Sequence, residues 1–129
     1  MRVLLDTHAL VWWLLGERQL GATARRLIGD PEVPVLVSVA SIWEIAIKHR
    51  SGKWEESGPL LADVDGWMVQ ARFTPLPITL AHALAAGRLD SLHKDPFDRM
   101  LIAQSRIENL SVVTIDPVFA DHGVLVIWR

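Results

Sequence analysis

The sequence predicts an α/β fold in which one mainly parallel central sheet is flanked by helices on both faces. Two observations predict it: short apolar, often β-branched segments alternate along the chain with segments of helical character, and half of the 129 residues are apolar. Strands separated by helices build βαβ units, whose strands run parallel. The length suits one core, so we expect a single domain over residues 1–129.

The first half of the chain predicts two strand-to-helix successions. Residues 2–6 indicate a buried strand, followed by a helix over 7–16 that ends near Gly16. A second helix over 22–29 stops at the breaker cluster Gly29-Asp30-Pro31. The β-branched segment 33–38 predicts a strand, and Ser38 then caps a helix over 39–50. The residues of this helix expected to face the core are Val39, Ile42, Trp43, Ala46 and Ile47.

The second half continues the alternation after a polar loop at 51–58. Pro59 suits the first turn of a helix over 59–71, whereas the two prolines of "FTPLPI", 73–78, argue against a long central strand. The remaining expected elements are helices over 79–87 and 95–109 and strands over 111–115 and 124–128.

Composition narrows the function classes. The absence of cysteine excludes disulfides and thiolate metal sites and favours a reducing compartment. No leader pattern and no apolar run of membrane-spanning length is visible, so we expect a cytoplasmic protein with no membrane partner. The formal net charge of −2 excludes nucleic-acid binding by bulk charge alone. Contact with a nucleic acid would have to be local, with a cation at an acidic site.

Several acids stand where chemistry is expected, although each has a local explanation. Asp6 and Asp116 follow predicted strands, and both are suited to cap the next helix. Asp95 precedes Pro96 as a helix cap does, which leaves Asp98, one turn on, less structurally explained. Glu44 can pair with Lys48 at the favourable i, i+4 spacing.

Taken together, the acids indicate a metal site. The carboxyl ends of parallel strands meet at one edge of a sheet, where active sites of such folds lie. Asp6, Glu44, Asp98 and Asp116 can converge there, and four carboxylates in one crevice require a cation. Oxygen ligands without a histidine or cysteine pattern favour Mg²⁺ or Mn²⁺, which serve phosphoryl chemistry.

Four segments in order carry a resemblance to a known family: "LLDTHALVWWL", "SIWEIAIK", "DPFDRMLIAQS" and "VVTID". They resemble the PIN domain, and specifically the VapC-type toxins of bacterial toxin–antitoxin pairs, over essentially the whole chain. The resemblance implies an endoribonuclease dependent on Mg²⁺ or Mn²⁺, a homodimer, a VapB-like antitoxin that plugs the site, and an RNA substrate such as transfer RNA. It also implies products with a 5′-phosphate and a 3′-hydroxyl.

The family's pattern carries over by position. The four acids are Asp6, Glu44, Asp98 and Asp116, of which the three aspartates would hold the metal and Glu44 would ligate it or orient the attacking water. Residues expected to support them are Thr7, Asp95 and Thr114.

Other side chains are weaker candidates. Lys48, Arg50 and Arg99 could contact RNA phosphates, although solvated helix ends explain these cations at least equally well. We assign no catalytic role to His8 or His93. Trp12 and Trp54 are candidates for an antitoxin or dimer contact, with ordinary packing as the alternative.

Two other functions compete with the ribonuclease. An aspartate-nucleophile phosphatase would carry a second aspartate two residues after Asp6, where this chain has His8. A non-catalytic interaction module of PIN-like fold would use the acids only as helix caps, and Asp6→Asn would then cost about 1 kcal/mol or less.

Overall fold

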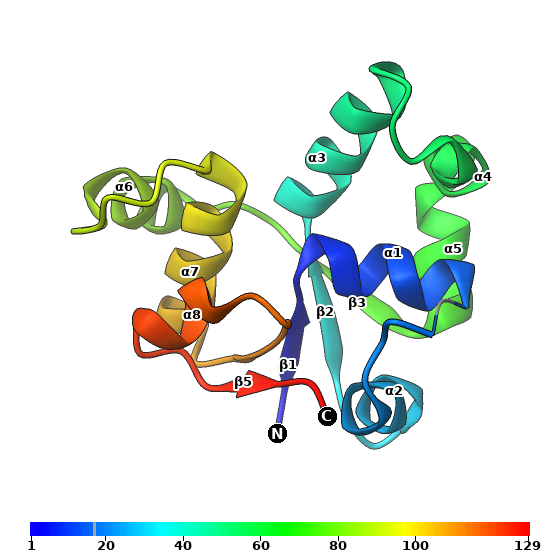
Figure 1. The fold of residues 1–129 in the computed structure, drawn as a ribbon, viewed down its shortest axis with the longest axis horizontal. Coiled ribbons are helices and arrows are strands. Elements are labelled where there is room, and N and C mark those ends of the chain that lie inside the picture. Colours follow the sequence, from blue (N-terminus) through cyan, green and yellow to red (C-terminus); the bar gives the residue numbers. More distant parts are fainter. Residues whose placement is uncertain (17) are drawn as a thin grey trace.

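The computed structural model describes residues 1–16 and 18–129. Within them, five strands form one sheet in which every neighbouring pair is parallel, in the order β3-β2-β1-β4-β5. The strands are β1 (Val3–Leu5), β2 (Val35–Ser38), β3 (Phe73–Leu76), β4 (Ser111–Val113) and β5 (Val126–Ile127). The predicted parallel α/β fold is confirmed (Figure 1).

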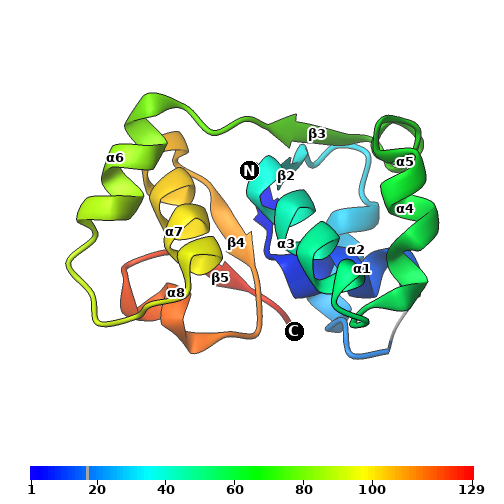
Figure 2. The same ribbon diagram turned by 90° about the horizontal axis from the view of Figure 1, so that it is seen from above.

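Helices cover both faces of the sheet, as predicted. One side carries α1, α2, α4 and α5, and the other carries α6, α7 and α8; the view from above separates the two groups (Figure 2). The helices are α1 (Thr7–Leu15), α2 (Ala22–Gly29), α3 (Val39–Arg50), α4 (Gly58–Ala62), α5 (Val64–Ala71), α6 (Leu80–Arg88), α7 (Pro96–Glu108) and α8 (Pro117–Asp121), with a 3₁₀ turn η1 (Glu55–Ser57) before α4. Among the described residues, none of the helices is long and apolar enough to cross a bilayer.

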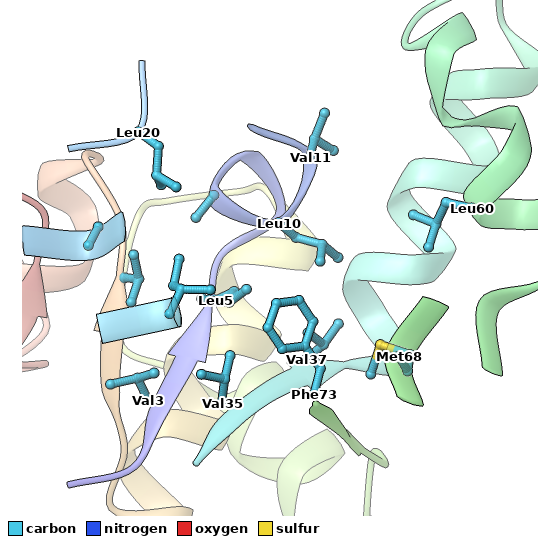
Figure 3. Packing of buried hydrophobic residues seen from close by; sticks show 14 of the residues in the cluster. Val3, Leu5, Leu10, Val11, Leu20, Val35, Val37, Leu60, Met68 and Phe73 are labelled. Atoms are coloured by element: carbon cyan, nitrogen blue, oxygen red, sulfur yellow. The ribbon is translucent and has the colours of Figure 1, made fainter. Parts of the chain in front are cut away.

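The core consists of two clusters, one on each face, because successive side chains of a strand point to opposite faces. Val3 and Leu5 of β1 belong to the cluster under α1, α2 and α5, which Figure 3 shows around Phe73 and Met68. Leu4 belongs to the cluster on the other face, with Phe119 of α8. Residues 3–5 are all fully buried, so β1 is the centre of the protein.

The prolines of 73–78 act as predicted. Residues 73–76 form β3, which pairs only with β2 and therefore lies at the edge of the sheet. The expected helix over 59–71 divides into α4 and α5 because Asp63 leaves helical geometry and its carboxylate accepts a hydrogen bond from the Gly66 backbone at 3.1 Å. The segment after Asp116 forms the short helix α8, which Asp116 caps as its position suggested.

The predicted core stripe of α3 is wrong except at Ile42, which is partly buried against the core. Val39, Trp43 and Ile47 are 40%, 60% and 46% exposed, whereas Glu44 is only 5% exposed and Ser41 is fully buried. The reason is the position of α3. It stands above the carboxyl ends of the strands and contacts both α1 and α7, so it buries a partly polar face against the other elements (Figure 1).

Candidate carboxylate site

Asp6 lies at the carboxyl end of the central strand and is 6% exposed. Its Oδ1 accepts a hydrogen bond from the Ala9 backbone at 2.7 Å, which caps α1. Its Oδ2 accepts one from the Thr114 hydroxyl at 2.5 Å. Burial raises the pKa of Asp6 from 3.8 to about 6 despite these bonds, and the nearby charge of Asp98 adds to the rise. An ionised Asp6 is therefore costly unless a positive charge stands beside it.

Thr114 joins Asp6 to the end of the neighbouring strand. Its hydroxyl oxygen also accepts a hydrogen bond from the Asp116 backbone at 3.0 Å. Asp116 in turn caps α8, because its Oδ1 accepts from the Val118 backbone at 3.0 Å. The Thr114 hydroxyl therefore contacts both the Asp6 carboxylate and the Asp116 backbone; its role in supporting a metal ligand stays a prediction.

Glu44 projects from the buried side of α3. Its Oε2 lies 2.6 Å from the Nζ of Lys48, and the Glu44 side chain is 7% exposed against 31% for that of the lysine. The i, i+4 pair expected from the sequence is thus present, but it is half-buried rather than a surface pair. The Lys48 ammonium therefore lies next to the Glu44 carboxylate and balances its charge.

Asp98 occupies the first turn of α7. Asp95 caps this helix, since its Oδ1 accepts from the Phe97 and Asp98 backbones at 2.9 and 3.1 Å. The Oδ2 of Asp98 lies 2.9 Å from the Nε2 of His93. Burial raises the pKa of Asp98, and the charges of Asp95 and Asp116 contribute to the same rise.

His93, to which the sequence assigns no role, contacts one of the four acids. It lies in the loop before α7, and its backbone N–H donates to the Ser91 hydroxyl oxygen at 3.1 Å. The one signal in the sequence is that His93 lies five residues before Asp98. This spacing alone does not determine the path of the loop that brings the two side chains together.

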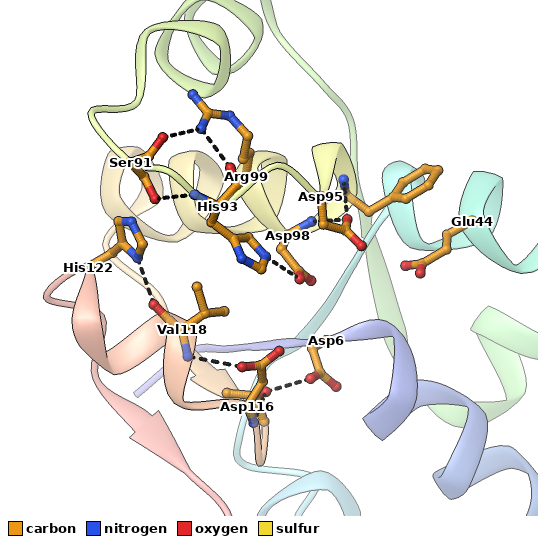
Figure 4. A network of polar contacts seen from close by, with 12 residues as sticks. Asp6, Glu44, Ser91, His93, Asp95, Asp98, Arg99, Asp116, Val118 and His122 are labelled. Carbon is orange, nitrogen blue, oxygen red and sulfur yellow. Dashed lines mark hydrogen bonds and ion pairs between the residues drawn. The ribbon is translucent and has the colours of Figure 1, made fainter.

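The four acids face a common space at the carboxyl edge of the sheet (Figure 4). They come from four places in the chain: the ends of β1 and β4, the side of α3 and the start of α7. Each carboxylate nonetheless contacts its own partner. Asp6 accepts from Thr114 and Asp116 from the Val118 backbone, Glu44 pairs with Lys48, and Asp98 pairs with His93. In residues 1–16 and 18–129, no three histidine or acidic side chains lie close enough together, as arranged, to hold a metal ion.

The chemistry of this donor set fits a hard divalent cation. All four groups are carboxylates, which suit Mg²⁺ or Mn²⁺. The charge of Asp98 adds to the raised pKa of Asp6, and the charges of Asp95 and Asp116 add to the raised pKa of Asp98; a cation would relieve this repulsion. Binding would require three of these carboxylates to come closer together than they lie in this arrangement.

Two other predicted residues are engaged elsewhere. The hydroxyl of Thr7 donates to the Oγ of Ser41 at 3.0 Å and so ties α1 to α3, without contacting an acid. The prediction that Arg99 contacts phosphate disagrees with its surroundings. Its guanidinium donates to the carbonyls of Ala86, Gly87, Leu89, Ser91 and His93, and so holds the loop between α6 and α7. Arg50, by contrast, is exposed at the end of α3.

Comparisons with known proteins agree with this fold. The family model of the PIN domain matches residues 3–125. A comparison with curated protein sequences finds no match. Among solved structures, the chain is similar to VapBC2 from Rickettsia felis bound to a DNA fragment from the promoter of its genes, with 15% identity over 100% of both chains and a TM-score of 0.73.

Two further structures share the fold. VapC20 from Mycobacterium tuberculosis, a toxin that cleaves the sarcin–ricin loop, is 17% identical over 98% of this chain and 99% of its own, with a TM-score of 0.71. FitAcB from Neisseria gonorrhoeae is 18% identical over 96% and 95% of the two chains, with a TM-score of 0.62.

Proposed function

Because the chain belongs to the PIN domain family, we propose that it is a metal-dependent endoribonuclease and the toxin of a type II toxin–antitoxin pair. The observation that carries the proposal is the convergence of four acids on the carboxyl edge of the sheet, centred on the buried Asp6 (Figure 4). Asp6 is buried, has a pKa of about 6 and is repelled by the Asp98 carboxylate. Perturbed carboxylates of this kind are typical of functional sites, whereas a helix cap does not require one.

In this proposal Asp6, Asp98 and Asp116 hold Mg²⁺ or Mn²⁺, and Glu44 joins them or orients the attacking water. Such an ion lowers the pKa of a bound water and offsets the charge that develops on a phosphate under attack. Thr114 fixes the orientation of the Asp6 carboxylate. Lys48 balances the charge of Glu44 through their ion pair.

The proposed partners follow from the same family. The substrate is RNA, such as transfer RNA, cut to leave a 5′-phosphate and a 3′-hydroxyl. A VapB-like antitoxin and a second copy of the chain complete the assembly, in the cytoplasm. The likeness to a structure of a toxin–antitoxin pair supports the partner. The exposed side chains of Val39, Trp43 and Ile47 supply an apolar surface on α3 for a protein contact.

One observation favours the alternative of a non-catalytic interaction module. Asp6, Asp95 and Asp116 all accept capping hydrogen bonds, so their presence does not require a metal. An RNA cleavage assay distinguishes the ribonuclease from the interaction module, because acids that only cap helices do not require a cation.

The test is cleavage of single-stranded RNA by the antitoxin-free protein with Mn²⁺ or Mg²⁺ and with EDTA. We expect cleavage that requires the ion, and a loss of at least about 100-fold in Asp6→Asn. The matched control is Asp65→Asn, which changes an exposed aspartate on α5. A 2′,3′-cyclic phosphate product, or equal cleavage by both variants, would contradict the proposal.

A further inference from the structure

A continuous series of aromatic rings runs across α1 from the carboxylate edge. The ring of Trp54 lies 5.3 Å from that of His8 at an interplanar angle of 89°. His8 lies 5.5 Å from Trp12, and Trp12 lies 5.6 Å from Trp128. We call Trp54, His8, Trp12 and Trp128 the aromatic row; it joins the turn before η1 to the end of β5.

Lys48 connects the aromatic row to the acids. Its Nζ lies 4.6 Å from the centroid of the Trp54 ring and 2.6 Å from the Oε2 of Glu44. The ring therefore holds the ammonium by a cation–π contact while the carboxylate holds it by an ion pair. An ammonium has three N–H donors, so this group can contact a further anion without leaving Glu44.

The backbone at Trp54 adopts an uncommon conformation. Trp54 has φ 51° and ψ 46°, a left-handed conformation that is uncommon for a bulky side chain. It follows a basic segment, 48–53, that holds Lys48, Arg50 and Lys53 and no acid, although Glu55 and Glu56 come next. The result is an arrangement of rings and cations at the edge of an acidic centre.

We propose that His8, Trp54 and Lys48 form a nucleotide subsite that binds single-stranded RNA next to the carboxylates. A base stacks on the exposed His8 ring, Trp54 supports that ring at a right angle, and Lys48 above the Trp54 ring contacts the adjoining phosphate. The inference rests on the proposed function, because it assigns the place where that substrate lies.

The surroundings favour a polyanion over a protein as the occupant. Single-stranded RNA offers bases, which stack on aromatic rings, and phosphates, which pair with cations. This surface carries both kinds of group, and Lys48 contacts both Trp54 and Glu44. The apolar side chains expected of a protein contact lie instead on the exposed side of α3, at Val39, Trp43 and Ile47.

The test is binding without cleavage. We would titrate a fluorescein-labelled single-stranded RNA of mixed sequence with antitoxin-free protein in EDTA and follow anisotropy. A second probe of equal length would carry abasic riboses, so that it keeps the charge and lacks the bases. We expect the wild-type protein to bind the RNA more tightly than the abasic probe.

Variants then test whether the aromatic row causes the preference for RNA over the abasic probe. Trp54→Leu and His8→Ala each weaken RNA binding by about 5- to 100-fold and leave binding of the abasic probe unchanged, whereas Trp54→Phe keeps most of the affinity. Lys48→Gln lowers the slope of log affinity against log salt by about 0.7. The controls are Trp67→Leu on α5 and Arg106→Gln on α7, which we expect to match the wild type. Thermal melts confirm folding, and His8 is exposed, so His8→Ala tests the subsite even if Trp54→Leu fails to fold.

The contradicting results are distinct. If RNA binding by His8→Ala and Trp54→Leu equals that of the wild type and Lys48→Gln keeps the salt slope, while the wild type still cleaves RNA, the subsite is wrong and the ribonuclease stands. If those variants lose only affinity for an antitoxin, the row is a protein-binding surface. If the wild type neither binds nor cleaves RNA, both proposals fail.

Discussion

At each end of α7 an acid of the helix pairs with a histidine from outside it, in two different settings. At its start, the Nε2 of His93 lies 2.9 Å from the Oδ2 of Asp98. At its end, the Nε2 of His82 on α6 lies 2.8 Å from the Oε2 of Glu108. Geometry alone does not distinguish a functional pair from a structural one.

Burial and neighbours distinguish them. At the end of α7 the histidine side chain is 1% exposed and the acid 35%. The Thr79 backbone donates to the Nδ1 of His82, so Nε2 carries the proton and donates to Glu108, which ties α6 to α7. At the start, both partners are partly exposed, and Asp98 faces the charges of other acids (Figure 4). The comparison teaches that gathered carboxylates, rather than a histidine–acid pair, mark the site.

The largest expected effect is on RNA cleavage and tests the difference between the two ends of α7. Asp98→Asn should lower RNA cleavage by at least about 100-fold, because it removes a proposed metal ligand. Glu108→Gln, which changes the matching acid at the other end, should leave cleavage within about threefold. Initial rates with saturating Mn²⁺ measure both. Equal losses in the two variants would show that cleavage depends on the stability of α7.

The second prediction concerns stability. His82→Ala should lower the free energy of unfolding by about 2–4 kcal/mol, because it opens a cavity and leaves buried groups without their hydrogen bonds. His93→Ala, at the partly exposed pair, should cost about 1 kcal/mol or less. Urea unfolding in EDTA measures the difference, and a larger loss for His93 would contradict it.

The third prediction concerns Asp6 and pH. Because its pKa rises from 3.8 to about 6 on folding, the folded state binds the extra proton between these values, and ionisation destabilises it above about pH 6. The shift corresponds to about 3 kcal/mol, which weakened hydrogen bonds to Thr114 and Ala9 offset in part. Asp6→Asn should therefore stabilise the metal-free protein by about 1–2 kcal/mol at pH 7.5.

The same variant should lose this advantage at pH 4, where Asp6 is protonated in the folded wild type. Urea unfolding of both proteins in EDTA across pH 4–8 checks the sign. Destabilisation of Asp6→Asn at every pH would mean that the carboxylate acts as a helix cap alone.

The smallest effect concerns a cap. Asp95→Ala should cost about 1 kcal/mol, because the Phe97 and Asp98 backbone N–H groups lose their acceptor. Cleavage should fall little if Asp95 only caps α7. A large fall in cleavage at unchanged stability would place Asp95 among the groups that support the metal.

The local structure could be predicted because it follows from local rules. Ser38 and Asp95 cap helices where the sequence indicates, and the prolines place β3 at the sheet edge. The parallel order of strands also places Asp6 and Asp116 at one edge. In these cases a few neighbouring residues determine the outcome.

What could not be predicted depends on contacts between distant segments. The exposed side of α3 was misassigned because periodicity identifies an apolar stripe without showing which side meets the sheet. The contacts of Arg99 with five carbonyls, and of His93 with Asp98, depend on the path of one loop. That the acids keep separate partners is likewise a property of three-dimensional packing.

The most direct test of the metal site is Mn²⁺-induced paramagnetic broadening in the amide NMR spectrum of the antitoxin-free protein. We expect the broadened amides to centre on Asp6, Glu44, Asp98 and Asp116, and the effect to vanish in Asp6→Asn and persist in Asp65→Asn. Diffuse broadening that survives Asp6→Asn would contradict the account and leave the acids as helix caps and ion pairs.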